Sequence, residues 1–250
     1  MPHRPPTDPT APASPAGAVG QADSFDIVVD GRPAPYGLRL GRAAVVVVDM
    51  QNDFVSPGGS VEASGGDVTL VAALVEPIAH VLEAARGRGI PVVYLQHCYR
   101  PDLADLGPER GKNALIHRAA RVGLPTEAPD GSPSRVLVRD TWSTRIVDRL
   151  APRDGELVIP KTRFSGFHGT TLDEDLRRLG VRDLILTGCT TSVCVEATLR
   201  DAMARDYRAL LLTDCVDEPQ GRAHHDSTVA LVESSLGWTA ESADLCRALA

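Results

Sequence analysis

The sequence predicts an α/β protein in three layers, with helices on both faces of a mostly parallel central sheet. Short, uninterrupted apolar runs alternate with longer segments whose apolar residues recur at helical spacing. No internal repeat is found, and 250 residues suit one domain with a tail. Because consecutive parallel strands need crossover connections, this alternation indicates an αβα sandwich.

Composition excludes several classes of protein. The chain is 43% hydrophobic and 24% charged, as globular proteins are. Its net charge of −7 and the absence of a basic run argue against nucleic-acid binding. We expect no membrane association, because no apolar run approaches the roughly 20 residues of a span. The N-terminus has no apolar signal core, which predicts a cytoplasmic protein, and five unpatterned cysteines predict reduced thiols.

The N-terminal part of the chain changes character twice. Residues 1–22 are rich in proline and alanine and predict a disordered tail, whereas residues 23–250 predict one folded domain. Residues 23–42 are expected to form an arm that leads into the sheet. Ala43–Val48 is an apolar, mostly β-branched run, as in a buried central strand. An amphipathic helix follows from Val68 to Arg88, with a bend expected at Pro77, which lies within this range.

The middle of the chain holds the second strand and a long insertion. Pro91–Gln96 reads as a buried strand. Residues 100–134 are polar and without periodicity, and loops of this length usually carry function, so we expect a substrate-covering loop. A short extra strand is expected over Arg135–Arg139, and the apolar residues between 146 and 150 suit a short helix.

The C-terminal half continues the alternation. Further buried strands are expected at Leu157–Lys161, Leu184–Gly188 and Leu210–Asp214. Helices are expected from Thr171 to Leu179, after Cys194, over His224–Val232, and over Thr239–Leu249, where Thr239 would be the cap.

Three of these strands lead into residues with distinctive chemistry: Asp49, Lys161 and Cys194. Parallel strands end at one edge of a sheet, so the three side chains can converge there. Each also has an ordinary interpretation, as a turn aspartate, a solvated lysine or a buried structural cysteine. Two facts favour a site. An acid directly after a buried run needs a partner, and Lys161 is one of only two lysines, with Lys112, among 26 basic residues.

Together these residues form a set that can cleave an amide. Cys194 would attack the carbonyl, and Asp49 would take the thiol proton and return it to the leaving amine. Lys161 would hold the carboxylate and the thiolate in place. Cys194 lies in the first turn of a predicted helix, where the helix dipole should lower its pKa. The backbone N–H groups near Thr190 and Cys194 would bind the oxyanion.

The motifs resemble the isochorismatase-like cysteine hydrolases. They are VVVVDMQNDF at Val45–Phe54, the lysine at 161 and GCTTSVCV at Gly188–Val195, in the family's order and spacing over residues 40–248. The resemblance implies a catalytic triad of Asp49, Lys161 and Cys194. It also implies a non-proline cis peptide between Cys189 and Thr190 that turns the oxyanion-hole amides inward, and a homo-oligomer, either dimer or tetramer.

Four further segments look most like motifs of the biuret hydrolases and ureidoacrylate hydrolases: Gln51–Phe54, Arg100–Leu106, Lys161 with Ser165–Phe167, and Cys194–Glu196. Nicotinamidase relatives place a metal-binding aspartate and two histidines after the second strand, where this chain reads His97–Cys98–Tyr99–Arg100–Pro101. We therefore expect no metal and no cofactor. True isochorismatases lack the nucleophilic cysteine, so Cys194 argues against vinyl-ether cleavage.

The substrate pocket is expected to be small and partly polar. Trp142 is either core or pocket wall, Arg100 either pairs with a substrate carboxylate or stays solvated, and His97 is more often structural than a general base. The candidate substrate-binding residues are Phe54, Gln96, His97, Tyr99, Arg100, Trp142, Phe164 and Phe167.

The leading hypothesis is a metal-independent cysteine amidohydrolase that cleaves a C–N bond of a small non-peptide amide or ureido compound. A lactam hydrolase acting on a larger metabolite is the second possibility, because a long loop can admit a bulky group. Two further classes stay open. One is a non-catalytic partner protein of the same fold, and the other is a redox protein that uses Cys189 as the resolving thiol for Cys194.

Overall fold

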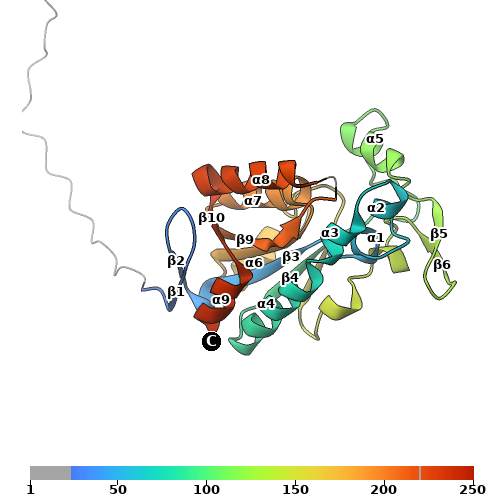
Figure 1. Ribbon diagram of the computed structural model, residues 1–250. Helices are drawn as coiled ribbons and strands as arrows, with labels where there is room; N and C mark the ends of the chain where they lie inside the picture. Colours follow the sequence, from blue (N-terminus) through green and yellow to red (C-terminus); the bar gives the residue numbers. More distant parts are fainter. Residues whose placement is uncertain (1–23, 220) are drawn as a thin grey trace, which may run out of the picture.

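The computed structural model describes residues 24–219 and 221–250, so the predicted tail of residues 1–22 lies outside them. Its centre is a six-stranded sheet in which every pairing is parallel (Figure 1). The fold class predicted from the sequence is confirmed. In spatial order the strands are β10 (Trp238–Ala240), β9 (Arg208–Asp217), β8 (Asp183–Cys189), β3 (Ala43–Val48), β4 (Val92–His97) and β7 (Leu157–Lys161).

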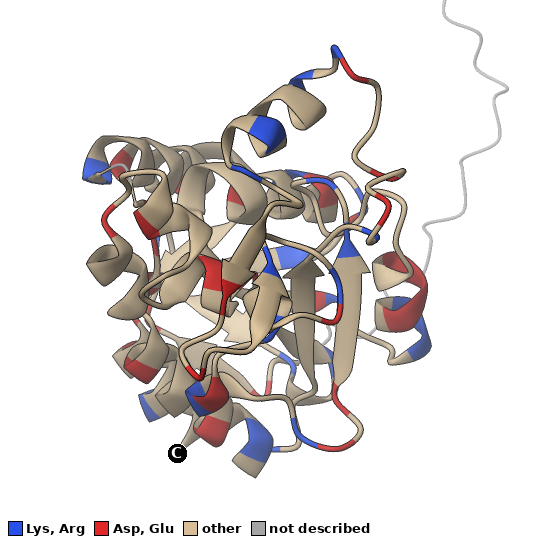
Figure 2. Ribbon diagram, turned by 90° about the vertical axis from the view of Figure 1, so that its right-hand side faces the viewer, with Lys and Arg blue, Asp and Glu red and all other residues tan. Residues whose placement is uncertain are grey.

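Helices cover both faces of this sheet (Figure 1). Acidic and basic positions are interspersed over them, without one continuous stripe of either sign in the view of Figure 2. The α-helices are α1 (Asn52–Val55), α2 (Ser60–Ala63), α3 (Val68–Ala72), α4 (Val75–Gly87), α5 (Lys112–Ala119), α6 (Leu172–Arg178), α7 (Glu196–Met203), α8 (Arg222–Leu231) and α9 (Ser242–Leu249). Short 3-10 turns lie at Leu40–Arg42, Trp142–Thr144 and Asp148–Leu150, and π-turns at Thr191–Val195 and Val232–Leu236.

The central strand β3 explains why its sequence is a continuous apolar run. Every residue of β3 is buried, and successive side chains enter two different cores. Val45 and Val47 pack with α4 and α9, whereas Val46 and Val48 pack with α6 and α7. A strand covered on both faces has no solvent side, so the polar–apolar alternation of a surface strand is absent.

Two expected helices differ from the observed ones. The segment from Val68 to Arg88 is two helices, and the break lies at Ala73–Leu74, not at Pro77. Pro77 falls in the first turn of α4, where its missing N–H costs nothing. The last helix begins at Ser242, not at Thr239, because Thr239 belongs to edge strand β10 and its hydroxyl donates to Glu233 at 2.7 Å.

The segments outside the sandwich are more ordered than the sequence indicates. The arm forms an antiparallel hairpin of β1 (Ile27–Val29) and β2 (Tyr36–Leu38). Residues 100–134 were expected to be irregular but contain α5, and a second hairpin joins β5 (Pro125–Glu127) to β6 (Pro133–Arg135). The strand expected over Arg135–Arg139 is thus displaced toward the N-terminus. In Figure 1, α5 stands apart from the helical layers.

One helical stretch among the described residues passes a length and composition test for a membrane span. It is Val68–Gly87, with a mean hydropathy of 1.6. This corrects the expectation that no apolar run approaches that length. Ile78, Val81, Leu82 and Ala85 on this stretch are buried in the core against the sheet. Burial in a protein core accounts for an apolar helix face without a membrane.

Candidate active site

The strand register brings the candidate catalytic residues to one edge of the sheet. His97 of β4 lies opposite Lys161 of β7, and Val48, the last residue of β3, lies opposite Gly188 of β8. Asp49 directly follows β3 and adopts a left-handed backbone conformation with φ of 52°. Such a conformation is uncommon outside glycine and clusters at functional positions. The predicted convergence at the carboxyl edge is thus realised in the structure.

The ammonium group of Lys161 lies at the centre of this arrangement. Its Nζ is 2.7 Å from Oδ2 of Asp49 and 3.3 Å from Sγ of Cys194. It also lies 3.2 Å from the carbonyl oxygen of Arg163 and 3.3 Å from Nδ1 of His97. The lysine and aspartate side chains are about 1% exposed, and Cys194 is 7% exposed. The structure therefore brings Asp49, Lys161 and Cys194 together as a buried, mutually contacting group.

Burial sets the protonation of this group. Burial acts to lower the pKa of Lys161, but the neighbouring Asp49 and Cys194 outweigh it, so the net shift is upward and the ammonium is retained. Burial also raises the pKa of Asp49, against the opposing effect of Lys161. The pKa of the Cys194 thiol is raised by burial, although Lys161 partly counteracts this. Burial therefore outweighs the expected lowering of the Cys194 pKa by the helix.

Three of these side chains also form a set that could hold a metal ion. The ligand atoms of Asp49, His97 and Cys194 lie within 4.8 Å of one another. However, the ammonium of Lys161 lies within 3.3 Å of a ligand atom of each, so a positive charge already occupies the position between them. A divalent cation there would face strong repulsion. The donor set therefore does not fit a metal while Lys161 is charged.

The backbone around Cys194 has two unusual features. The peptide bond between Cys189 and Thr190 is cis, as the resemblance implies. Cys194 lies in the π-turn Thr191–Val195, which leads directly into α7. π-turns inside helices are rare and occur frequently at functional sites. The side chain of Cys194 thus projects from the junction between the end of β8 and the following helix.

Side chains that follow β9 in the chain contact the turn that bears Cys194. The backbone N–H of Ser192 donates to the carboxylate of Glu218, which is buried. The hydroxyl of Thr191 lies 3.2 Å from Nδ1 of His225 on α8. Neither Glu218 nor His225 was singled out from the sequence, because both lie far along the chain from the triad. The tertiary contacts of their segment with residues 191–192 are the signal that identifies them.

A cluster of buried rings lies beside the triad. Nε2 of His97 is 3.0 Å from the hydroxyl of Tyr99, which donates to the carbonyl of Thr162 at 3.2 Å. The ring of His117 from α5 packs 4.8 Å from His97 and 5.8 Å from Phe164, between centroids. Burial lowers the pKa of His97 well below its usual value, and the charge of Lys161 adds to this. His97 is therefore neutral.

Three other predicted pocket residues lie around the end of β3 and β4. The side-chain amide of Gln96 donates to the carbonyl of Thr144 at 2.7 Å. Trp142 opens the same turn, and its carbonyl accepts from Asn52 at 2.9 Å. Phe54 is partly buried between the main core and the cluster that packs under the insertion. These residues connect the 141–145 turn to the strands that bear the triad.

Two predicted pocket residues are not brought to this group. Arg100 is 57% exposed and pairs with Asp102 at 2.8 Å, which agrees with the solvated alternative. Phe167 is buried in the core under α6 and α7, where its ring packs 5.8 Å from Tyr207 and carries the guanidinium of Arg205 at 4.9 Å. Neither side chain contacts the ring cluster of His97.

The insertion supplies residues that the sequence did not single out. Asn113 and His117 are four residues apart, so one face of α5 directs both toward the triad. Nδ2 of Asn113 donates to the hydroxyl of Tyr99 at 3.1 Å, and Nδ1 of His117 lies 2.7 Å from the carbonyl of Asn113. Polar residues at this spacing were the available signal, but without the fold nothing placed them beside β4.

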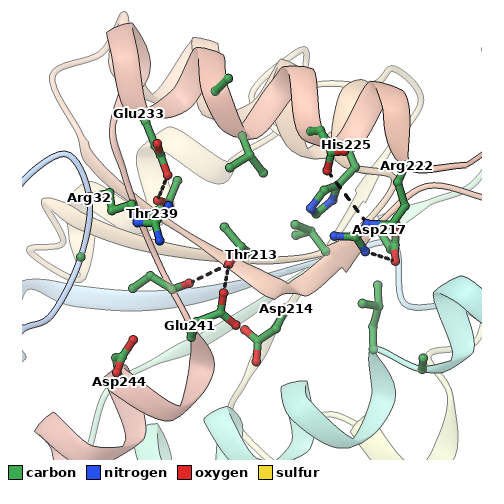
Figure 3. Close-up of a pocket in the computed structure, with 18 of the residues that line it drawn as sticks. Arg32, Thr213, Asp214, Asp217, Arg222, His225, Glu233, Thr239, Glu241 and Asp244 are labelled. Atoms are coloured by element: carbon green, nitrogen blue, oxygen red, sulfur yellow. Dashed lines mark hydrogen bonds and ion pairs between the residues drawn. The ribbon is translucent and has the colours of Figure 1, made fainter.

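A groove with a volume of about 710 Å³ lies away from the candidate catalytic residues. Figure 3 shows it between α8 and α9, with Asp217, Arg222 and His225 at one end and Asp244 at the other. Asp49, Lys161 and Cys194 are not among its lining residues. This groove therefore does not coincide with the candidate chemistry at the carboxyl edge of the sheet.

Comparisons with known proteins agree with the fold. The model of the isochorismatase domain family matches residues 43–244. The ureidoacrylate amidohydrolase RutB of Azorhizobium caulinodans is 35% identical over 223 residues, which are 89% of this chain and 97% of that protein. RutB of Agrobacterium fabrum is also 35% identical, over 88% of this chain and 95% of that protein. The chain therefore belongs to the isochorismatase family.

Solved structures of related hydrolases share this fold. A cysteine hydrolase from Pseudomonas syringae aligns with a TM-score of 0.71 and 27% identity, over 86% of this chain and 95% of that one. The N-carbamoylsarcosine amidase of Thermoplasma acidophilum aligns with a TM-score of 0.60 and 27% identity, over 80% of this chain and 96% of that one. Together these relatives support a hydrolase that acts on carbon–nitrogen bonds other than peptide bonds.

Proposed function

We propose that this protein is a metal-independent cysteine amidohydrolase that cleaves a C–N bond of a small ureido compound through a thioester intermediate. The single observation that carries the proposal is the ammonium of Lys161 between the carboxylate of Asp49 and the thiol of Cys194, at 2.7 and 3.3 Å. The names of the relatives support a ureido substrate, since they act on ureidoacrylate and N-carbamoylsarcosine.

The first half of the reaction follows from these contacts. The Cys194 thiol is neutral in the closed site, so its proton passes to Asp49 as sulfur attacks the carbonyl carbon. Lys161 stabilises the thiolate character that develops on sulfur. The backbone N–H groups of Thr190 and Cys194 would bind the oxyanion. The C–N bond then breaks, and Asp49 returns its proton to the leaving nitrogen.

The second half regenerates the enzyme with the same residues. A water molecule attacks the thioester carbon, and Asp49 takes a proton from that water. The C–S bond breaks, and the proton returns to sulfur, so that Cys194 is again a neutral thiol. Lys161 stays protonated throughout, because Asp49 and Cys194 surround its ammonium and raise its pKa. Atoms and charges balance without a metal or a redox cofactor.

The burial of the nucleophile favours a small substrate. Cys194 is 7% exposed, and His117 and Asn113 of α5 lie over the neighbouring side chains. Substrate entry therefore requires the insertion to move, and closure would exclude water from the acyl-enzyme. A bulky lactam would prevent the insertion (residues 100–134) from closing over the site. This is why we rank a linear ureido compound above the cyclic amide of a larger metabolite.

The two non-hydrolytic alternatives are less well supported. A non-catalytic partner protein would have no need for a buried aspartate–lysine–cysteine contact, which is costly to maintain. A redox role would need Cys189 to resolve Cys194. The thiol of Cys189 is fully buried and donates to the carbonyl of Asp49 at 3.3 Å. Cys189 therefore serves as a contact that helps to hold Asp49 in position.

The proposal is tested by product release. Wild type and Cys194→Ala would be incubated in EDTA with biuret, ureidoacrylate, N-carbamoyl amino acids, nicotinamide and several lactams, and released ammonia or amine measured. We expect release by wild type alone, from one or more ureido compounds. Equal release by both proteins would exclude Cys194 as the nucleophile. Wild-type activity on lactams alone would favour the second candidate.

We also propose that the protein works in the cytoplasm as a homo-oligomer, a dimer or a tetramer. The family resemblance supports this assembly, and the hairpin of β1 and β2 offers an exposed apolar surface at Phe25 and Val28. Sedimentation of the full chain would decide the assembly, because a single species at the mass of one chain would contradict it.

A further inference from the structure

Arg163 follows the catalytic lysine by two residues and reaches under the insertion. Its Nη1 donates to the carbonyl of Asp105 at 3.1 Å and to its neighbour Thr162 at 2.6 Å. Gly107 of the insertion has no side chain in the way, since a Cβ there would lie 2.7 Å from Nη2 of Arg163. The guanidinium is therefore seated between the cover and the strand end that bears Lys161.

This guanidinium is close to the ring cluster of the candidate site. The carbonyl of Thr162 accepts both from Nη1 of Arg163 and from the hydroxyl of Tyr99, so the two donors converge on one oxygen. Burial lowers the pKa of His117, and the charges of Lys161 and Arg163 lower it further. Arg163 thus adds a second positive charge beside the triad, on the side covered by α5.

Among the described residues, Arg163 forms no ion pair or hydrogen bond with an acidic side chain. The comparably placed Arg86 forms a fork with Glu156 at 2.7 and 2.8 Å, and Arg208 pairs with Asp183 at 2.7 Å. Only Nη1 of Arg163 has acceptors in the described part of the chain, and both are carbonyl oxygens. Its Nε and Nη2 have no acceptor in the described structure, and together they form the planar edge of a guanidinium that suits a carboxylate.

The side-chain oxygen of Asn113, near Arg163, lacks a hydrogen-bond donor. The side-chain amide of Asn113 donates to Tyr99 and to the carbonyl of Leu106, but its buried Oδ1 accepts no hydrogen bond in the described structure. A buried acceptor without a donor is costly. Beside the triad the protein therefore leaves an unpaired cation and an unfilled acceptor, which a molecule with a carboxylate and N–H groups would satisfy together.

We infer that Arg163 is a specificity residue that binds a carboxylate of the substrate, so that the preferred substrates are ureido acids and not neutral ureido compounds. This inference rests on the proposed function and narrows it. The carboxylate would bind the free edge of the guanidinium, while the ureido carbonyl faces Cys194. Asn113 would accept an N–H of the ureido group. Neutral biuret would satisfy Asn113 but leave Arg163 unpaired.

The test compares an anionic with a neutral substrate. We would measure kcat and KM of wild type, Arg163→Gln and Arg163→Lys with ureidoacrylate and with biuret. Arg163→Gln should lower kcat/KM for ureidoacrylate by about ten- to hundredfold, the range of a lost charge-assisted hydrogen bond, mainly through KM. It should change kcat/KM for biuret by less than about threefold. Arg163→Lys keeps the charge but loses the fork, so we expect an intermediate loss.

Two further variants provide controls. Arg118→Gln removes a positive charge from α5, where Arg118 is exposed and paired with Glu109, and should affect neither substrate. Arg100→Gln tests another basic residue, one that the sequence offered as a partner for a substrate carboxylate. An acid-selective loss in Arg100→Gln and not in Arg163→Gln would overturn the inference. An equal loss of kcat/KM on both substrates in Arg163→Gln would also overturn the inference. Such a loss would mean that Arg163 only positions the insertion through its hydrogen bond to Asp105.

A binding measurement separates this inference from the proposed function. In the Cys194→Ala background, calorimetry would compare 3-ureidopropionate with its neutral amide, with and without Arg163→Gln. The inference requires that Arg163→Gln weakens binding of the acid at least about tenfold and leaves binding of the amide unchanged. In one outcome, wild type hydrolyses biuret while the Cys194→Ala protein binds the acid no more tightly than the amide. That result would support the proposed amidohydrolase function and reject the role of Arg163. Acid-selective binding that depends on Arg163, without turnover of any substrate by wild type, would support the role of Arg163 and reject the amidohydrolase.

Discussion

Lys161 and Asp49 form an ion pair inside the protein, with Nζ and Oδ2 2.7 Å apart and neither side chain more than 1% exposed. The two residues come from β7 and from the end of β3, which are not neighbours in the sheet. Strand β4 separates them, and the side chains meet above its carboxyl end. A pair buried this deeply is held by its mutual attraction and by the contacts that surround it.

We predict that Lys161→Met abolishes activity and destabilises the protein by about 3–5 kcal/mol, because it leaves the Asp49 carboxylate buried and unpaired. Urea unfolding and turnover would measure the two effects. In the double variant Asp49→Asn with Lys161→Met the unpaired charge is gone, so part of the stability should return while activity stays absent. Additive losses of stability in the double variant would contradict a coupled pair.

Cys194 should be a slowly alkylated thiol in the resting enzyme. Burial raises its pKa above the ordinary value, so the thiolate fraction grows with pH throughout the range below that pKa. We expect the rate of carbamidomethylation at Cys194 to rise steadily from pH 6 to pH 9 without a plateau. Mass spectrometry of the peptide would measure it, with the half-exposed Cys246 in the same sample as reference. A plateau below pH 8 would show instead that the helix terminus governs this thiol.

Asp53 should make stability depend on pH. Burial raises its pKa from 3.8 to about 6, although the N–H of Ser60 donates to its carboxylate at 3.1 Å. The folded state therefore binds more protons than the unfolded state between about pH 4 and 6, and the free energy of unfolding falls as pH rises through that window. The shift corresponds to about 3 kcal/mol.

The corresponding substitution is Asp53→Asn, which removes this titration. The difference in free energy of unfolding between Asp53→Asn and wild type should rise by about 2–3 kcal/mol from pH 4 to pH 8. Urea unfolding of both proteins at both pH values would measure this difference. Asp67 is the matched contrast, because its hydrogen bonds from Thr69 lower its pKa, so the Asp67→Asn difference should change in the opposite direction. A pH-independent difference for Asp53→Asn would contradict the assignment.

Gly188 should tolerate no side chain. Its φ is +106°, and a Cβ would lie 2.0 Å from the carbonyl oxygen of Val48, which is backbone of the adjacent strand and cannot give way. We expect Gly188→Ala to cost more than about 3 kcal/mol in stability and to displace the turn that bears Cys194. Gly180→Ala is the control, since Gly180 has a similar φ of +75° but open space, and should cost about 1 kcal/mol.

The sequence alone was enough to establish the fold class, and it predicted which residues would gather at one edge of the sheet. A strand covered on both faces must be apolar along its whole length, so Ala43–Val48 and Leu184–Leu186 were recognisable, and polar residues that follow such runs stand out. Asp49 and Lys161 were therefore predicted as candidate site residues without coordinates, and Cys194 was added because it lies at a predicted helix start and within the motif that resembles the family. The parallel arrangement then required their strands to end at one edge, and the register confirms it.

What only the tertiary structure decided is the set of contacts between residues distant along the chain. The seating of Arg163 under Gly107, the unfilled acceptor of Asn113 and the hold of Glu218 on Ser192 leave no periodic pattern in the sequence. The same holds for the protonation of Cys194. A helix terminus is local and lowers a thiol pKa, but burial depends on everything packed around the sulfur, and here burial has the larger effect.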